Sequence, residues 1–303
     1  MNTREWALLT FTILGQLAAG MMLVLMIVRA YVTSKVGAAE ADRMTDIPMF
    51  MVVPIMGLAL LASLLHLNNL VNVVKAVPNL GSSWLSREVV IAVAFVVVAV
   101  VYAFLQWRKI GSNSLRNVIG WIGAIIGIVL TYAMPMVYML RTVPVWNTPI
   151  TVITFCVTAL LLGTLGAAAA LAVNYFIIQK HDLKASSKRL ELLREVVQST
   201  TIAAIILLGV EFLVLPLYMA YLGAAAMESL KLMMGTYGLV LVIRLLLVFG
   251  GAGVLATYLF RTASSAGKER LMATLVYSAF VMVLVGEVMG RFLFYATNLR
   301  VGL

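Results

Sequence analysis

Eight long apolar stretches constrain the fold of this chain more than any other feature of its sequence. A helix needs about 20 mainly apolar residues to cross a bilayer core. Stretches of this kind cover residues 6–29, 48–67, 88–107, 118–140, 150–178, 197–223, 235–260 and 271–295. Of the 303 residues 63% are hydrophobic and 11% are charged, whereas soluble domains have about 45–50% apolar and about 25% charged residues. The sequence predicts an all-α polytopic membrane protein, a single domain over residues 1–303 with eight transmembrane helices.

Basic residues between the stretches indicate how the bundle is oriented. When helix-end residues are counted with their loops, the first, third, fifth and seventh connectors hold 14 Lys and Arg. The remaining connectors and both terminal segments hold 7. Cytoplasmic loops are enriched in Lys and Arg, so we expect the odd connectors inside and both termini outside. The first stretch lacks the short apolar region and cleavage site of a signal peptide, and we expect a retained helix. The net charge of +10 then reflects basic loops rather than a nucleic-acid partner.

The scarcity of cysteine and histidine limits the redox chemistry that the protein can carry by itself. One cysteine excludes a disulfide framework and any iron–sulfur cluster held by this chain alone. The two histidines lie far apart: His66 at the outer end of the second stretch, and His181 in a cytoplasmic connector. They are not placed to clamp one haem, so we expect no haem and no metal site in this chain.

Costly polar residues inside the stretches are functional candidates, because an ionisable group in a bilayer is unfavourable by a few kcal/mol. From the direction of each helix, nearly all of them fall in the outer half, and the inner half is almost purely apolar. His66 ends the second stretch, Ser86 and Glu88 open the third, and Arg244 lies in the outer half of the seventh. Possible supporting residues in the outer half are Gln16, Trp84, Glu211, Glu287 and Arg291.

Structural roles compete with functional ones for several of these residues. Glu211 and Arg244 lie at similar depth, which favours an ion pair between the sixth and seventh helices. Glu287 and Arg291 are four residues apart on one helix face and are able to neutralise each other. Glu88 is also suited to the positive N-terminal end of its own helix.

An outer cluster of histidine, carboxylate and arginine suits the oxidation of a lipid-soluble quinol. The two quinol hydroxyls need hydrogen-bond acceptors, and the two released protons need a route to water. His66 and Glu88 are predicted to accept those protons, with Arg244 and Ser86 positioning the ring. Because no cofactor is expected in the chain, the electrons must pass to a redox centre on a partner subunit.

Three motifs resemble the membrane anchor subunits of the dimethyl sulfoxide reductase family. The segment LLHLNNLVNVVKAVPNLGSSWLSREVV is similar to the family's connector between its second and third helices. The opening REWALLTFTILGQLAAG and the closing GEVMGRFLFY are similar to the family's first and last helices. The sequence departs from the family at 68–70, where Asn-Asn-Leu replaces Gly-x-Pro, and Glu211 has no secure counterpart.

The resemblance implies a haem-free anchor in a bacterial cytoplasmic membrane that binds menaquinol. It implies a four-cluster iron–sulfur subunit and a molybdopterin catalytic subunit as partners, with the terminal reduction on the catalytic subunit. The family's quinol-site histidine and glutamate correspond to His66 and Glu88, and its helix-7 arginine corresponds to Arg244. The alternative hypothesis is a secondary transporter that uses Glu211, Arg244 and Glu287 as a relay, with paired broken helices and a site at the midplane.

Overall fold

The computed structural model describes residues 3–66, 77–179, 186–263 and 268–301, which are almost entirely helical. In this part of the protein, eight helical segments are long and apolar enough to cross a membrane. This confirms the predicted all-α class and the number of spans. The elements are α1 (Thr3–Val36), α2 (Ala38–His66), η1 (Val77–Asn79), α4 (Trp84–Arg108), α5 (Asn113–Met136), α6 (Pro149–Gln179), α7 (Ser186–Ala225), α8 (Met227–Met234), α9 (Gly238–Leu245), η2 (Leu246–Ala252), α10 (Gly253–Ala263) and α11 (Glu269–Ala296).

Several helices extend beyond the predicted stretches. The predicted connector over 35–46 is mostly helical, because α1 runs to Val36 and α2 starts at Ala38. Only Gly37 breaks the helix, with φ at 93°, a conformation that glycine adopts without strain. Likewise α7 starts at Ser186, inside the predicted fifth connector. Hydropathy marks the part of a helix that lies in hydrocarbon, and charged helical turns outside it escape that signal.

The seventh span is the least regular. It consists of α9, the π-helical segment η2 and α10, and it starts at Gly238 rather than at 235. The short helix α8 occupies most of the predicted sixth connector. The π segment starts two residues after Arg244, and such segments occur often at functional sites.

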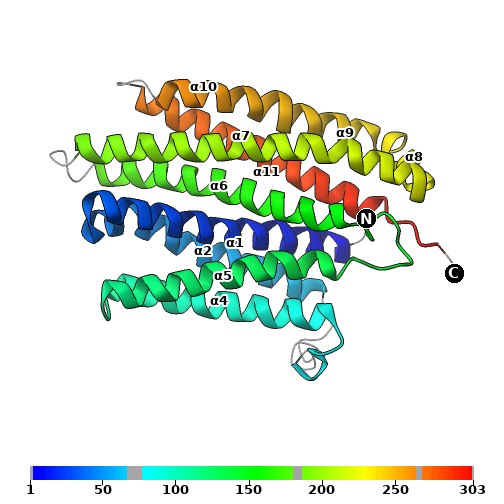
Figure 1. Ribbon diagram of the computed structural model, residues 1–303, viewed down its shortest axis with the longest axis horizontal. Coiled ribbons are helices and arrows are strands. Elements are labelled where there is room, and N and C mark those ends of the chain that lie inside the picture. The colour runs from blue at the N-terminus through cyan, green and yellow to red at the C-terminus, as the bar shows by residue number, and fades with distance from the viewer. Residues whose placement is uncertain (1–2, 67–76, 180–185, 264–267, 302–303) are drawn as a thin grey trace.

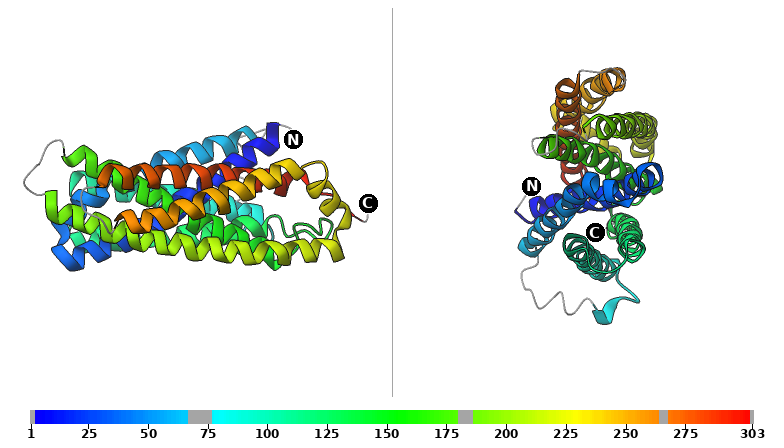
Figure 2. Two further views of the ribbon diagram at one scale, coloured as in Figure 1. Left: turned by 90° about the horizontal axis from the view of Figure 1, so that it is seen from above. Right: turned by 90° about the vertical axis from the view of Figure 1, so that its left-hand side faces the viewer.

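The spans form two groups of four that meet along α1 and α6. Helices α1, α2, α4 and α5 pack on one side, and α6, α7, α9–α10 and α11 pack on the other (Figures 1 and 2). The two groups approach most closely where Gly20 of α1 crosses Gly163 of α6. A Cβ added to Gly20 would lie 1.9 Å from the backbone oxygen of Ala159. Small residues thus allow backbone-to-backbone contact at the centre of the bundle.

Both termini of the protein lie at one end of the bundle, which we call the terminus end (Figure 1). The other end, which we call the far end, carries the turns between α1 and α2 and between α4 and α5. Eight spans require the termini to share an end. Which end faces the cytoplasm is a prediction from the basic residues.

A buried charge cluster at the far end is built from residues that the sequence assigns to the first and third connectors. Arg29 of α1 is fully buried and donates to the carboxylate of Asp42 and, at 2.8 Å, to Asn117. Lys109 bridges Asp42 and Asp46 at 2.8 and 2.6 Å. The cluster ties α1, α2, α4 and α5 together. Hydropathy did not reveal it because the two aspartates lie in a helical turn that was assigned to a loop.

A single asparagine compensates for a proline inside α2. Pro48 has no N–H, so the carbonyl of Met44, four residues earlier, lacks its helical donor. Asn174 of α6 donates to this oxygen at 2.7 Å and to the neighbouring Arg43 oxygen at 2.9 Å. This contact fixes α2 against α6 and allows the proline in a buried helix.

Candidate functional site

One face of α11 carries the polar side chains around which the candidate site is built. Glu287, Arg291 and Tyr295 follow one another at four-residue intervals, so they lie on the same side of the helix. All three side chains are buried, because α11 packs against α6, α9 and α1. This row joins a charged cavity beside Glu287 to an aromatic cluster around Tyr295.

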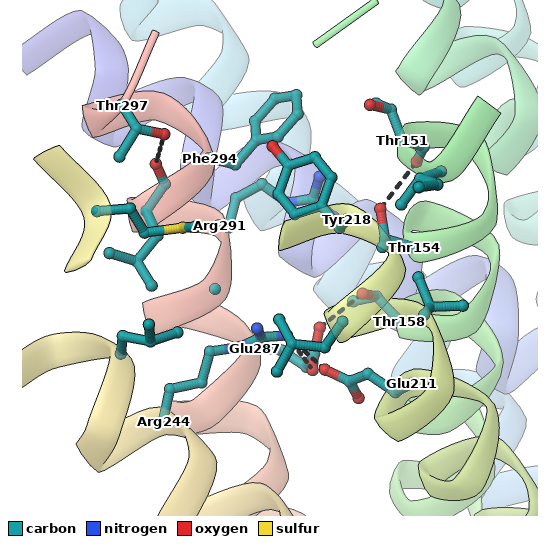
Figure 3. A pocket seen from close by; sticks show the side chains of 17 residues that line it. Thr151, Thr154, Thr158, Glu211, Tyr218, Arg244, Glu287, Arg291, Phe294 and Thr297 are labelled. Carbon is teal, nitrogen blue, oxygen red and sulfur yellow. Dashed lines mark hydrogen bonds and ion pairs between the residues drawn. The ribbon is translucent and has the colours of Figure 1, made fainter. Parts of the chain in front are cut away.

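The cavity has a volume of about 90 Å³ and lies between α6, α7, α9 and α11 (Figure 3). Arg244 Nη2 donates to Glu211 Oε1 and lies 3.7 Å from Glu287 Oε1. Thr158 Oγ1 donates to Glu287 Oε2 at 2.6 Å. One guanidinium is thus shared by carboxylates from two other helices, which confirms the ion pair that the depths of Glu211 and Arg244 favoured.

Arg291 takes its hydrogen-bond partner from α1 rather than from Glu287. Its Nη2 donates to Gln16 Oε1 at 2.8 Å, and Gln16 Nε2 donates to the backbone oxygen of Phe155 at 2.9 Å. The guanidinium carbon lies 3.5 Å from the centroid of the Phe155 ring, which adds a cation–π contact. The self-neutralised Glu287–Arg291 pair that the spacing allows is therefore replaced by bonds to other helices.

An aromatic cluster surrounds the last member of the row. Tyr295 donates its hydroxyl proton to the Tyr138 hydroxyl at 2.8 Å. The Tyr138 ring packs edge-on against Trp146 and Phe294, at centroid distances of 5.3 and 5.4 Å. Trp146 Nε1 in turn donates to the Phe294 backbone oxygen at 2.8 Å. These contacts close the terminus end of the bundle and hold the tyrosine pair in place.

Glu88 lies beside this tyrosine pair, one turn into α4. Its side chain is only 4% exposed, and no described residue hydrogen-bonds to its Oε1 atom. It is close enough to Tyr138 and Tyr295 to interact with both electrostatically. A buried carboxylate oxygen without a donor is unfavourable by about 1–3 kcal/mol or more. This atom is therefore a strong candidate to accept a hydrogen bond from a ligand.

The other residues at the start of α4 shape its surroundings. Ser86 is buried, and its backbone N–H donates to the capping Ser83 Oγ at 3.3 Å. Trp84 packs edge-on against Tyr132 of α5. Arg87 lies over the Trp84 ring at 4.4 Å and donates to two backbone oxygens of the preceding turn. Arg87 thus stabilises the start of the helix.

His66 is the last residue of α2, at the terminus end and on a helix that packs against α4. Its backbone position therefore agrees with a site shared with Glu88. The side chain of His66 and residues 67–76, which include the departure at 68–70, lie outside the described part of the protein. His181 also lies outside it. The pairing of His66 with Glu88 stays a prediction.

The structure divides the predicted quinol-binding residues into two groups. Ser86 and Glu88 lie with α2, α4 and α5, whereas Arg244 lies with α7, α9 and α11 (Figures 1 and 2). Helices α1 and α6 run between the two groups, and Gln16 and Arg291 link them. Arg244 is therefore not placed to contact a ring that is bound at Glu88.

Three polar residues of the site were missed at the sequence level. Tyr295 follows Arg291 by four residues, and this spacing was a usable signal. Thr158 belongs to a threonine row on α6 with Thr151 and Thr154, all of which line the cavity. Tyr138 falls inside the predicted stretch 118–140, but α5 ends at Met136, so it lies in the connector, where no local pattern marks it. Among the described residues, no group of three or more His, Cys, Asp or Glu side chains is gathered as a metal site.

Comparison with known proteins identifies the family. The profile of the DMSO reductase anchor subunit (DmsC) matches residues 1–297. YnfH, a subunit of an anaerobic dimethyl sulfoxide reductase of Escherichia coli, is 26% identical over 99% of this chain and 96% of its own length. The C subunit of the anaerobic dimethyl sulfoxide reductase of the same organism is 25% identical over the same shares. The C subunit from Haemophilus influenzae is 30% identical over 57% of this chain and 62% of its own length.

These matches and the eight apolar helices make this a multi-pass protein of the bacterial inner membrane. The chain belongs to the family of DMSO reductase anchor subunits.

Proposed function

We propose that the protein anchors a DMSO reductase-type complex and oxidises menaquinol at the terminus end, next to Glu88. The anchor role follows from the family, and the named relatives are subunits of anaerobic dimethyl sulfoxide reductases. The electrons leave to an iron–sulfur subunit that carries them to a molybdopterin subunit. The excess of basic residues at the far end supports the terminus end as the outer side of the membrane.

The observation that carries the quinol proposal is the free oxygen of Glu88. Among the described residues, nothing donates to its buried Oε1 atom. A quinol hydroxyl is a donor of the kind this atom lacks, and its apolar ring and tail partition into the lipid phase. The bond stabilises both partners, since it satisfies a carboxylate oxygen that the described part of the protein leaves unpaired. A carboxylate that receives this bond is also suited to accept the proton during oxidation.

The surroundings of Glu88 support the same assignment. Ser86 lies buried on the preceding half-turn, and α2 brings the backbone of His66 to the same end. On the protein side, the hydrogen-bonded hydroxyls of Tyr138 and Tyr295 lie within electrostatic range of the carboxylate. In this assignment Glu88 and His66 accept the two protons and Ser86 orients the ring. Arg244 lies outside this contact shell.

The test is the binding of a fluorescent quinol analogue to the assembled complex in membranes. We expect Glu88→Gln to weaken binding at least tenfold, because the neutral amide replaces a charged acceptor with a weaker one. Glu228→Gln is the matched control: Glu228 is an exposed glutamate on α8 that pairs with Lys231 at 2.7 Å. Unchanged binding and unchanged quinol-linked turnover in Glu88→Gln would refute the site.

A further inference from the structure

The cavity between α6, α7, α9 and α11 holds buried charges that the quinol site does not use. Glu211, Arg244, Glu287 and Arg291 all line it. They come from three helices, and each is at least partly buried in a bilayer-spanning segment, where charge is unfavourable. With all four ionised the cluster is electrically neutral. One bound proton therefore changes its net charge from zero to plus one.

Each of the four residues also presents a buried atom that has no hydrogen-bond partner within the described part of the protein. These atoms are Oε2 of Glu211, Oε1 of Glu287, and the Nε atoms of Arg244 and Arg291. Two are acceptors and two are donors. Ordered water pairs with donors and acceptors of this kind, because each buried water makes about three hydrogen bonds.

The volume of the cavity favours water over a quinol ring as its occupant. A cavity of about 150 Å³ is known to hold benzene, and one water takes up about 30 Å³ in the liquid. The volume of about 90 Å³ is therefore too small for a two-ring quinol head, but it accommodates about three waters. The threonines of α6 add hydroxyls to the wall, so the cavity is polar enough to stay wet.

The two carboxylates are placed to exchange a proton. In Figure 3 they point toward each other beside the guanidinium of Arg244. Repulsion between adjacent carboxylates favours a proton bound between them. The other polar groups that face the pair are uncharged, apart from Arg291, and come from each neighbouring element: Thr151, Thr154 and Thr158 on α6, Tyr218 on α7, Thr297 after α11, and Gln16 of α1 through Arg291.

The packing of α9 on α11 gives the arginine its position. A Cβ added to Gly290 would lie 2.6 Å from Arg244 Nε, so a side chain at this position would displace the guanidinium from its place against α11. The π segment starts at Leu246, two residues after Arg244. Glycine and π turn together hold a cation between two acids, which is a more specialised arrangement than a simple interhelical ion pair needs.

We propose that this cavity is a hydrated proton-binding site in which Glu211 and Glu287 take up and release one proton through water. A row of polar groups, Arg291, Tyr295 and Tyr138, leads from the cavity toward Glu88. Insofar as the cavity receives protons from quinol, the inference rests on the proposed function. Proton exchange with water in the cavity does not depend on it.

The experiment is infrared difference spectroscopy of the intact complex in membranes, between alkaline and acidic pH, in H₂O and in D₂O. We expect a carboxylic-acid C=O band that appears on acidification and shifts in D₂O, because cavity water exchanges its protons. The band should be absent from Glu211→Gln and from Glu287→Gln and present in Glu228→Gln. No such band, or a band that persists in both cavity variants, overturns the proposal.

Two further measurements keep the result interpretable. The Glu211→Asp variant retains the carboxyl, so it should retain a shifted band even if Glu211→Gln fails to assemble. Loss of the band in Glu211→Asp as well, in a complex that has assembled, counts against the proposal. Quinol-analogue binding is then measured in the same samples: Glu88→Gln should lose binding and keep the band, and Glu287→Gln should show the reverse. The two proposals thus fail independently.

Discussion

A methyl group at Gly20 is expected to force α1 and α6 apart at the centre of the bundle. The added Cβ would lie 1.9 Å from the Ala159 oxygen and 2.9 Å from Gly163 Cα. Ordinary contact begins at 3.4 Å, so the helices must separate by about 1.5 Å, the difference between 3.4 and 1.9 Å. Both contacted atoms belong to backbone, and no side-chain rotation relieves the clash.

This movement reaches the candidate site, because Gln16 lies one turn before Gly20 and Phe155 lies one turn before Ala159, the two residues in contact. Their hydrogen bond is 2.9 Å long. A separation of about 1.5 Å lengthens it to roughly 4.4 Å, beyond the limit of about 3.5 Å for a hydrogen bond. Overpacking lowers the free energy of unfolding by about 1–3 kcal/mol, and the lost bond adds about 1 kcal/mol. We expect Gly20→Ala to lower it by about 2–4 kcal/mol in total.

The protein supplies its own probe for this test. Cys156 is the only cysteine, is partly buried, and is adjacent to Phe155 on α6. Heating the purified full-length chain in detergent micelles, where Cys156 is the one thiol present, with a thiol-reactive fluorogenic dye reports when this region opens. The matched control is Gly57→Ala on α2, where an added Cβ meets nothing within 4 Å and alanine favours the helix. Equal melting temperatures for the two variants would refute the packing argument.

The same thermal assay checks three other expectations. Arg244→Leu should lower the free energy of unfolding by about 3–5 kcal/mol, because two buried carboxylates lose their shared cation. Adding Glu211→Leu should restore part of this free energy. A double variant that melts below the single variant would contradict this. Arg29→Met, which breaks the cluster at the far end, should also lower it by about 3–5 kcal/mol, and unchanged melting would show that the cluster is dispensable. Asn174→Leu should lower the free energy of unfolding by about 1–3 kcal/mol, because the Met44 oxygen loses its donor. Val173→Leu, at an exposed neighbouring position, should melt like the wild type.

Depth in the membrane was predictable from sequence for much of the site. A helix rises about 1.5 Å per residue, so the position of a residue within its apolar stretch sets its distance from the bilayer surface. Glu88, Arg244 and Glu287 were assigned in this way to one half of the bundle. The structure places all three near the terminus end, where α11, α9 and the start of α4 meet the connectors.

Helix ends were less predictable than helix number. The second helix begins at Ala38, ten residues before the apolar stretch that revealed it. Its first turns carry Asp42 and Asp46, whose charges are neutralised by Arg29 and Lys109. Polar residues occur both in loops and in helical turns whose charges pair with other helices. The two cases differ only in tertiary contacts, which the sequence does not show.

The class of fold, the number of spans, the family motifs and the depth of the scarce charges all follow from the order of the amino acids. These properties depend on composition and on distance along one helix. Which charges meet depends on how the helices pack. Packing joined Arg244 to Glu211 and Glu287, directed Arg291 to Gln16, and separated Glu88 from Arg244 by α1 and α6. Helix neighbours and helix rotation are set by close packing between segments far apart in the sequence, such as the Gly20–Gly163 crossing, and no local pattern encodes them.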